Sequence, residues 1–178
     1  MRRLLPLLLG SACLCAAPLP EDSNGWFRDP LQWRQRNGVW QARGNATGMV
    51  VHEASPVCQR ATATAVVQAD QANPESWSVA GLALVTDPAN FWHVALVQSP
   101  ESSGAKRYFE LCEMLDGQWL SQNSLTVEIS ETPGTWQPGQ PVRLHLKLDP
   151  AGIEGRAESS DGTLLFRKRY AFSAKAVT

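Results

Sequence analysis

The sequence predicts an all-β protein built as an antiparallel β-sandwich. Short runs rich in Val, Thr, Leu and aromatic residues recur along the chain, and such runs are typical of strands. Gly, Pro, Asn and Asp separate these runs at close intervals and mark turns. No segment beyond residue 20 shows the periodicity of an amphipathic helix. Together these three observations favour stacked antiparallel sheets over a helical fold.

The first residues indicate export. A basic start, the apolar run at residues 4–9 and the small residues after it are typical of a secretory signal peptide. We assign residues 1–20 to it and expect a periplasmic or extracellular protein whose single domain spans residues 23–178. The apolar run is shorter than the about 20 residues of a membrane-spanning helix, so no transmembrane segment is expected. A lipid anchor on Cys13 is the less favoured alternative, because Gly10 stands where lipoproteins usually carry Leu.

Three segments between residues 60 and 98 have the pattern of strands. The segment 60–68 (RATATAVVQ) alternates β-branched and small residues, as half-buried strands do. The apolar segments 77–85 and 91–98 flank a turn rich in Asp, Pro and Asn at residues 86–90. Because strands that are neighbours in sequence usually pair, we expect these two to form a hairpin.

The later strands carry the clearest signals. Asp116-Gly117 is a strong hairpin turn, and it joins segments 106–115 and 118–121. In 142–149 (VRLHLKLD) apolar and polar residues alternate strictly, which predicts one buried and one solvent-facing side. In all, about ten or eleven strands are expected: 39–43, 47–53, 60–68, 77–85, 91–98, 106–115, 118–121, 125–130, 142–149, 153–158 and 163–170.

Charge and cysteine content limit the partners. The net charge is −1 and no basic stripe is present, so no nucleic-acid partner is expected. The run Arg167-Lys168-Arg169 is expected on a solvated face. Export permits a disulfide between Cys58 and Cys112, and two separate buried thiols are the alternative. No cofactor motif or metal-ligand cluster occurs, and a monomer is expected.

Residues 80–96 (AGLALVTDPANFWHVAL) combine a small-residue strand, an Asp–Asn turn and two aromatics before an alternating strand. This pattern resembles the concanavalin A-like (laminin G-like) jelly-roll superfamily. More narrowly, it is similar to secreted proteins related to 3-keto-disaccharide hydrolases and to family 16 glycoside hydrolase-like domains. Segments 33–40, 111–119 and 136–155 fit the same layout. The resemblance implies a jelly-roll sandwich and a carbohydrate or glycoconjugate ligand, and fold alone does not determine function.

The resemblance also suggests which strand face holds the ligand. It places Trp92 in the core, which leaves His93 on the opposite side. Small Gly81 and Ala83 on the neighbouring strand are expected to leave room there for a ligand. Sugars need aromatic plates and fixed polar groups. The candidate ligand-binding residues on this side are Trp77, His93, Tyr108, Glu110 and Trp119. The alternatives are a structural strand histidine at His93 and core positions for the tryptophans.

No catalytic residue is assigned. Family 16 catalysis uses carboxylates that alternate on one strand, whereas the matching region offers Glu110, Cys112 and Glu113. Asp87 and Asn90 carry oxygen ligands that suit calcium, and ordinary turn chemistry is the preferred interpretation. Three functions therefore remain: a non-catalytic carbohydrate-binding module, which is favoured, a glycosidase or keto-sugar hydrolase or lyase, and a structural or interaction protein of the envelope.

Overall fold

The described part of the chain is all-β, as predicted. The computed structural model describes residues 5–7, 33–37, 39–42, 49–50, 59–87, 89–120 and 126–172. Within these ranges every regular element is a strand, apart from the single 3-10 turn η1 (Glu101–Ser103). No helix in these ranges is long and apolar enough to cross a membrane.

One sheet, here named sheet I, is an antiparallel meander that continues along the chain. It comprises β5 (Ser78–Asp87), β6 (Asn90–Gln98), β7 (Arg107–Leu115) and β8 (Gln118–Trp119). The short β1 (Leu5–Leu7) pairs with the outer edge of β5. This strand falls within the predicted signal peptide, and the rest of that segment, Cys13 included, lies outside the described residues.

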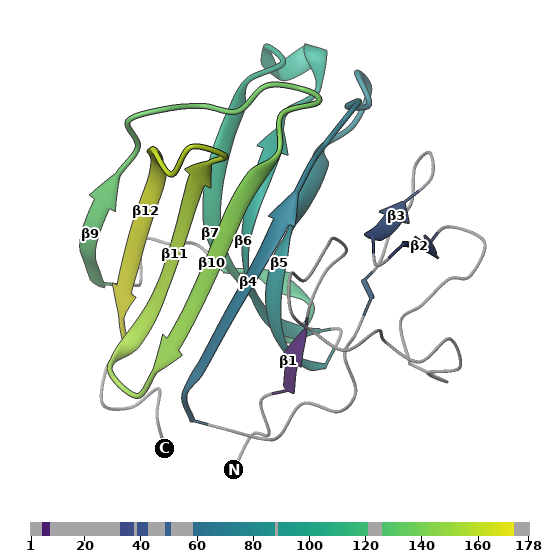
Figure 1. Cartoon of the computed structure of the whole chain (residues 1–178). Coiled ribbons are helices and arrows are strands. Elements are labelled where there is room, and N and C mark those ends of the chain that lie inside the picture. Colours follow the sequence, from purple (N-terminus) through teal and green to yellow (C-terminus); the bar gives the residue numbers. More distant parts are fainter. Residues whose placement is uncertain are drawn as a thin grey trace.

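The second sheet, sheet II, brings together strands that are distant in sequence. Its order is β4 (Ala61–Val67), β10 (Val142–Asp149), β11 (Gly152–Ser159), β12 (Leu164–Ala171) and β9 (Thr126–Glu131). Figure 1 shows its strands in front of those of sheet I, so the two sheets form a sandwich. A separate hairpin of β2 (Trp33–Arg36) and β3 (Val39–Ala42) completes the described elements.

From residue 61 onward the strands occur where the sequence pattern places them, whereas β1 and β2 were not among the expected strands. On β10 the expected apolar side is buried in the core, with exposed fractions of 0–6% at Val142, Leu144, Leu146 and Leu148. The β7–β8 turn is also as predicted, since Asp116 and Gly117 both have positive φ, of 50° and 76°, as a type I′ hairpin turn requires. Segment 47–53 is different, because its described residues Met49 and Val50 lie in no strand.

Gly155 on β11 packs closely against the facing sheet. A Cβ there would lie 3.1 Å from Leu111 Cδ1 on β7 and 3.1 Å from Val94 Cγ2 on β6. A larger side chain at Gly155 would push the sheets apart, so this glycine sets the local thickness of the core.

The outer face of sheet II carries a network of ion pairs. Arg167 binds Glu154 at 3.3 Å, and Arg169 binds Glu128 at 2.6 Å and Asp149 at 3.2 Å. Lys168, between these two arginines, points the other way. It shares the inner face with Tyr170, and its Nζ lies 5.0 Å from the centre of that ring. Burial lowers the pKa of Lys168. The prediction of a fully solvated basic run is therefore wrong at its middle residue, because side chains alternate along a strand.

We expect the ion pair of Arg169 with Asp149 to make the free energy of unfolding depend on pH. Its hydrogen bonds lower the pKa of Asp149, and burial opposes this effect. A carboxyl whose pKa is lowered on folding stabilises the fold above its unfolded pKa, and this contribution disappears as the pH falls through the folded value. In Arg169→Met, the free energy of unfolding should therefore fall less between pH 7 and about pH 3 than in the parent protein. Urea titrations at both pH values measure this difference. An equal fall in both proteins would contradict the assignment, and Arg143→Met is the matched control.

Candidate functional site

The five candidate ligand-binding residues lie on one face, the outer side of sheet I. Cross-strand partners share a face, and the register pairs Gly81 with Ala95 and Ala95 with Glu110. One step along, Ala83 pairs with His93, and His93 with Cys112. The opposite face of the same strands carries core residues such as Trp92, Val94 and Leu96. The predicted division of β6 into a core side and an outer side is therefore confirmed.

Aromatic side chains stand at both ends of this outer face. At one end, Trp77 meets Tyr108 edge to face, with ring centres 6.4 Å apart. At the other, Trp119 on β8 lies 5.0 Å from the His93 ring and 5.6 Å from the Phe91 ring. Trp77 and Trp119 are the exposed members, at 56% and 53%. Both lie near strand ends beside polar turns.

The two exposed tryptophans are far apart. Trp119 pairs with Met114, and Tyr108, the neighbour of Trp77, lies six positions before Met114 on the same strand. At about 3.3 Å per residue this separation is roughly 20 Å. A ligand that touches both ends must therefore be an extended chain.

Glu110 and His93 form a pair between these aromatic ends. The His93 Nε2 atom lies 2.9 Å from Glu110 Oε1. The His93 side chain is 5% exposed, whereas that of Glu110 is 24% exposed. The His93 side chain is therefore almost fully buried. It holds the carboxylate of Glu110, which keeps an accessible edge, in a fixed position.

Tyr108 lies beside Glu110 on the same strand face. Burial, followed by the negative charge of Glu110, raises the pKa of the Tyr108 hydroxyl. The phenol therefore stays protonated at neutral pH and can donate a hydrogen bond.

This face is filled rather than open, both at Ala95 in its centre, which is 0% exposed, and toward its Trp119 end. Ala83, Val85 and Phe91 are 0%, 0% and 7% exposed, and Met49 and Met114 pack against them. This corrects the expectation that small residues leave room for a ligand. At Gly81 the reason is close packing, because a Cβ would lie 2.5 Å from the Val94 carbonyl oxygen and 2.7 Å from Ala95 Cβ.

The predicted disulfide is not observed. Cys112 is a buried thiol on β7, and no disulfide occurs within the part of the chain that is described. Its sulfur lies 4.0 Å from the Glu113 carbonyl oxygen. Cys58 lies outside the described residues.

Asp87 and Asn90 have a turn role. The Asn90 amide donates to Asp87 Oδ1 at 2.9 Å, and the same oxygen accepts the backbone N–H of Ala89 at 2.9 Å. Asn90 Oδ1 in turn accepts the N–H of Asp116 at 3.0 Å. These bonds join the β5–β6 turn to the β7–β8 turn. Among the described residues, no group of three His, Cys, Asp or Glu side chains is placed to hold a metal ion.

A second histidine network lies on the outer face of sheet II. His145 Nδ1 is 3.1 Å from the Thr64 hydroxyl, and His145 Nε2 is 3.3 Å from Glu158 Oε2. Arg156 binds the other oxygen of Glu158 at 2.6 Å. Sequence reasoning did not connect these residues, although the alternation in 142–149 placed His145 on the polar side. This network joins the three strands β4, β10 and β11, and the positive charge of Arg156 neutralises Glu158 within it.

No protein-family model, no curated protein and no solved structure matches the chain.

Proposed function

We propose that the protein is an exported, non-catalytic carbohydrate-binding domain of the concanavalin A-like type, and that a glycan chain lies over the filled outer side of sheet I and contacts it at the exposed tryptophans of its two ends. The observation that carries this proposal is the pair of half-exposed tryptophans, Trp77 and Trp119, at the two ends of one sheet face. Apolar sugar faces stack on such rings, while fixed polar groups orient the hydroxyls. Tyr108 and Glu110 supply polar groups between the two tryptophans.

Binding is favoured over hydrolysis because the described residues of this face offer one carboxylate and not two. Glycosidases use two carboxyl groups within about 5–9.5 Å of each other. Among the described outward-facing residues of β5 to β8, Glu110 is the single carboxylate. Glu113, the other acid on β7, pairs with core residue Trp92 and so faces the opposite side.

Affinity electrophoresis in gels that contain neutral polysaccharides tests the proposal. We expect at least one neutral glycan to retard the protein, and Trp119→Ala to weaken that binding by about tenfold or more, as loss of a buried aromatic anchor does. Trp77→Ala should act similarly. Val127→Ala is the matched control, because Val127 is 47% exposed on β9 of the other sheet.

Two results would contradict the proposal. One is that no polysaccharide retards the parent protein, which would favour an interaction role in the envelope. The other is that the Trp77→Ala/Trp119→Ala double variant binds as the parent does.

A further inference from the structure

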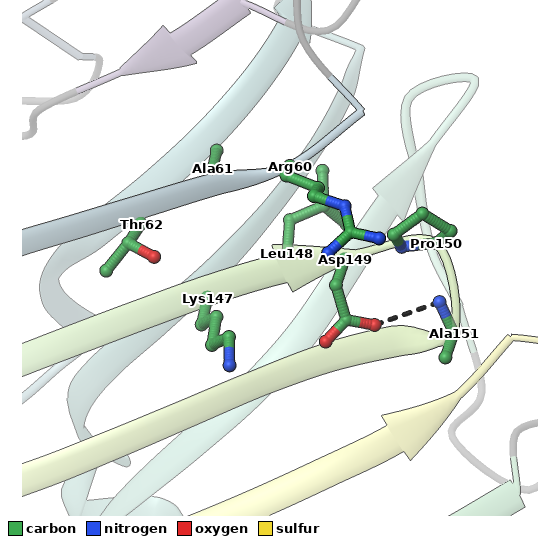
Figure 2. Close-up of a pocket in the computed structure, with 8 residues that line it drawn as sticks. All are labelled: Arg60, Ala61, Thr62, Lys147, Leu148, Asp149, Pro150 and Ala151. Atoms are coloured by element: carbon green, nitrogen blue, oxygen red, sulfur yellow. Dashed lines mark hydrogen bonds between the residues drawn. The ribbon is translucent and has the colours of Figure 1, made fainter.

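A pocket of about 500 Å³ lies at the edge of sheet II, where β4 begins beside the turn between β10 and β11. This volume is within the range of small-molecule sites. Ala61, Leu148 and Pro150 form its apolar part. Figure 2 shows Arg60 and Lys147 on two sides of the Asp149 carboxylate. The pocket thus combines an apolar wall with a concentration of charge.

The carboxylate of Asp149 is already engaged. Arg169 donates to both of its oxygens, at 3.2 and 3.3 Å. The turn N–H groups of Ala151 and Gly152 donate to Oδ1 at 2.9 and 3.0 Å. Its negative charge is therefore matched by a cation from β12, which lies outside the pocket lining.

The next carboxylate along this face is engaged in the same way. Glu154, which pairs with Lys147 across the strands, accepts a hydrogen bond from Arg167 at 3.3 Å. Arg60 and Lys147 are both exposed, and neither forms an ion pair with any described residue. The pocket therefore holds two positive charges that its own carboxylate does not cancel.

Strand pairing holds the donors close together. Lys147 and Thr62 are direct cross-strand partners in the β4–β10 ladder, so their side chains share the outer face. Arg60 precedes Thr62 on the same side of the chain because side chains alternate. A guanidinium, an ammonium and a hydroxyl therefore line one pocket, and such donors match an oxyanion.

We propose that this pocket binds an oxyanion, a carboxylate, sulfate or phosphate group, held between Arg60 and Lys147 with the Thr62 hydroxyl as a third donor. The apolar ring of Pro150 in the pocket lining suits the carbon skeleton of a ligand that carries the group. The site lies on the opposite sheet from the proposed glycan-binding face, so it does not depend on that function.

Amide chemical-shift mapping of the whole protein with sodium sulfate tests the proposal, with sodium chloride at equal ionic strength as the reference. We expect saturable shifts at residues 60–62 and 147–151. Arg60→Gln/Lys147→Gln should weaken sulfate binding by about tenfold or more, because two charge-assisted hydrogen bonds are lost. Arg143→Gln removes one positive charge from the same face of β10, outside the pocket lining, and should leave the affinity unchanged.

A second arm compares inorganic sulfate with a sulfated oligosaccharide and its unsulfated parent. Tighter binding of the sulfated sugar than of free sulfate would identify an acidic glycan as the source of the group, and equal binding would identify a free anion. Shifts that do not saturate, or equal weakening by Arg143→Gln, would overturn the proposal. Trp119→Ala should keep its sulfate affinity, so failure of the glycan face and failure of this site are distinguishable.

Discussion

Replacement of Trp136 by Ala should lower the free energy of unfolding by about 3–5 kcal/mol. Trp136 lies between β9 and β10, outside any strand, and is 2% exposed. Its indole N–H donates to the carbonyl oxygens of Val97 at 3.3 Å and Tyr108 at 3.1 Å. The substitution removes a large core side chain and leaves these carbonyl groups without that donor. For a domain of this size the melting temperature should fall by roughly 6–20 °C.

Two further variants separate the contributions of Trp136. Trp136→Phe keeps an aromatic ring and loses the donor, so it should cost only about 1–2 kcal/mol for the hydrogen bonds, together with a modest loss of packing. Trp77→Ala removes the same side chain from a position that is 56% exposed, and its cost should be much smaller. Unfolding of Trp136→Ala and Trp77→Ala at the same urea concentration would show that Trp136 does not anchor the segment between β9 and β10 to the core.

Replacement of Leu146 by Ala is expected to cost about 2–5 kcal/mol. Leu146 is 0% exposed at the centre of β10, between Ala63 on β4 and Gly155 on β11. Both partners are small and cannot expand into the space, so the substitution leaves a cavity in the core between the two sheets. Urea unfolding with a common slope for parent and variant measures the difference.

The adjacent residue is the control for Leu146→Ala. Lys147 is exposed on the other side of the strand, so Lys147→Ala should change the free energy of unfolding by no more than about 0.5 kcal/mol. A shift of the strand register by one residue would exchange these two results, because it turns every side chain to the opposite face. Similar costs for both variants would therefore reject the register.

The candidate site could be predicted in position but not in accessibility. Alternation along β5, β6 and β7 placed His93, Tyr108 and Glu110 on one side, and the structure brings them together with Trp77 and Trp119. Alternation along the strands did not reveal that the Trp119 and Phe91 rings would lie beside His93, or that Met49 would pack against the cluster of Ala83, Val85 and Phe91. These contacts join segments that are distant in the chain, and no local pattern specifies them.

The pocket at the start of β4 shows the same division. Sequence alternation placed Lys147 on the polar side of its strand, but nothing in the chain order places it beside Arg60. That proximity arises because β4 and β10, which are far apart in sequence, pair in sheet II. Only this pairing places the positively charged side chains of Arg60 and Lys147 in one pocket.

The sequence by itself determined the strands from residue 61 onward, which of their sides faces the core, and the turn at Asp116-Gly117, because these depend on alternation and backbone preferences over a few residues. Only the tertiary structure decided the order of sheet II, the inward direction of Lys168, and which outward-facing side chains stay exposed. Those properties depend on pairing and packing between distant segments, and a short stretch of sequence does not specify such contacts.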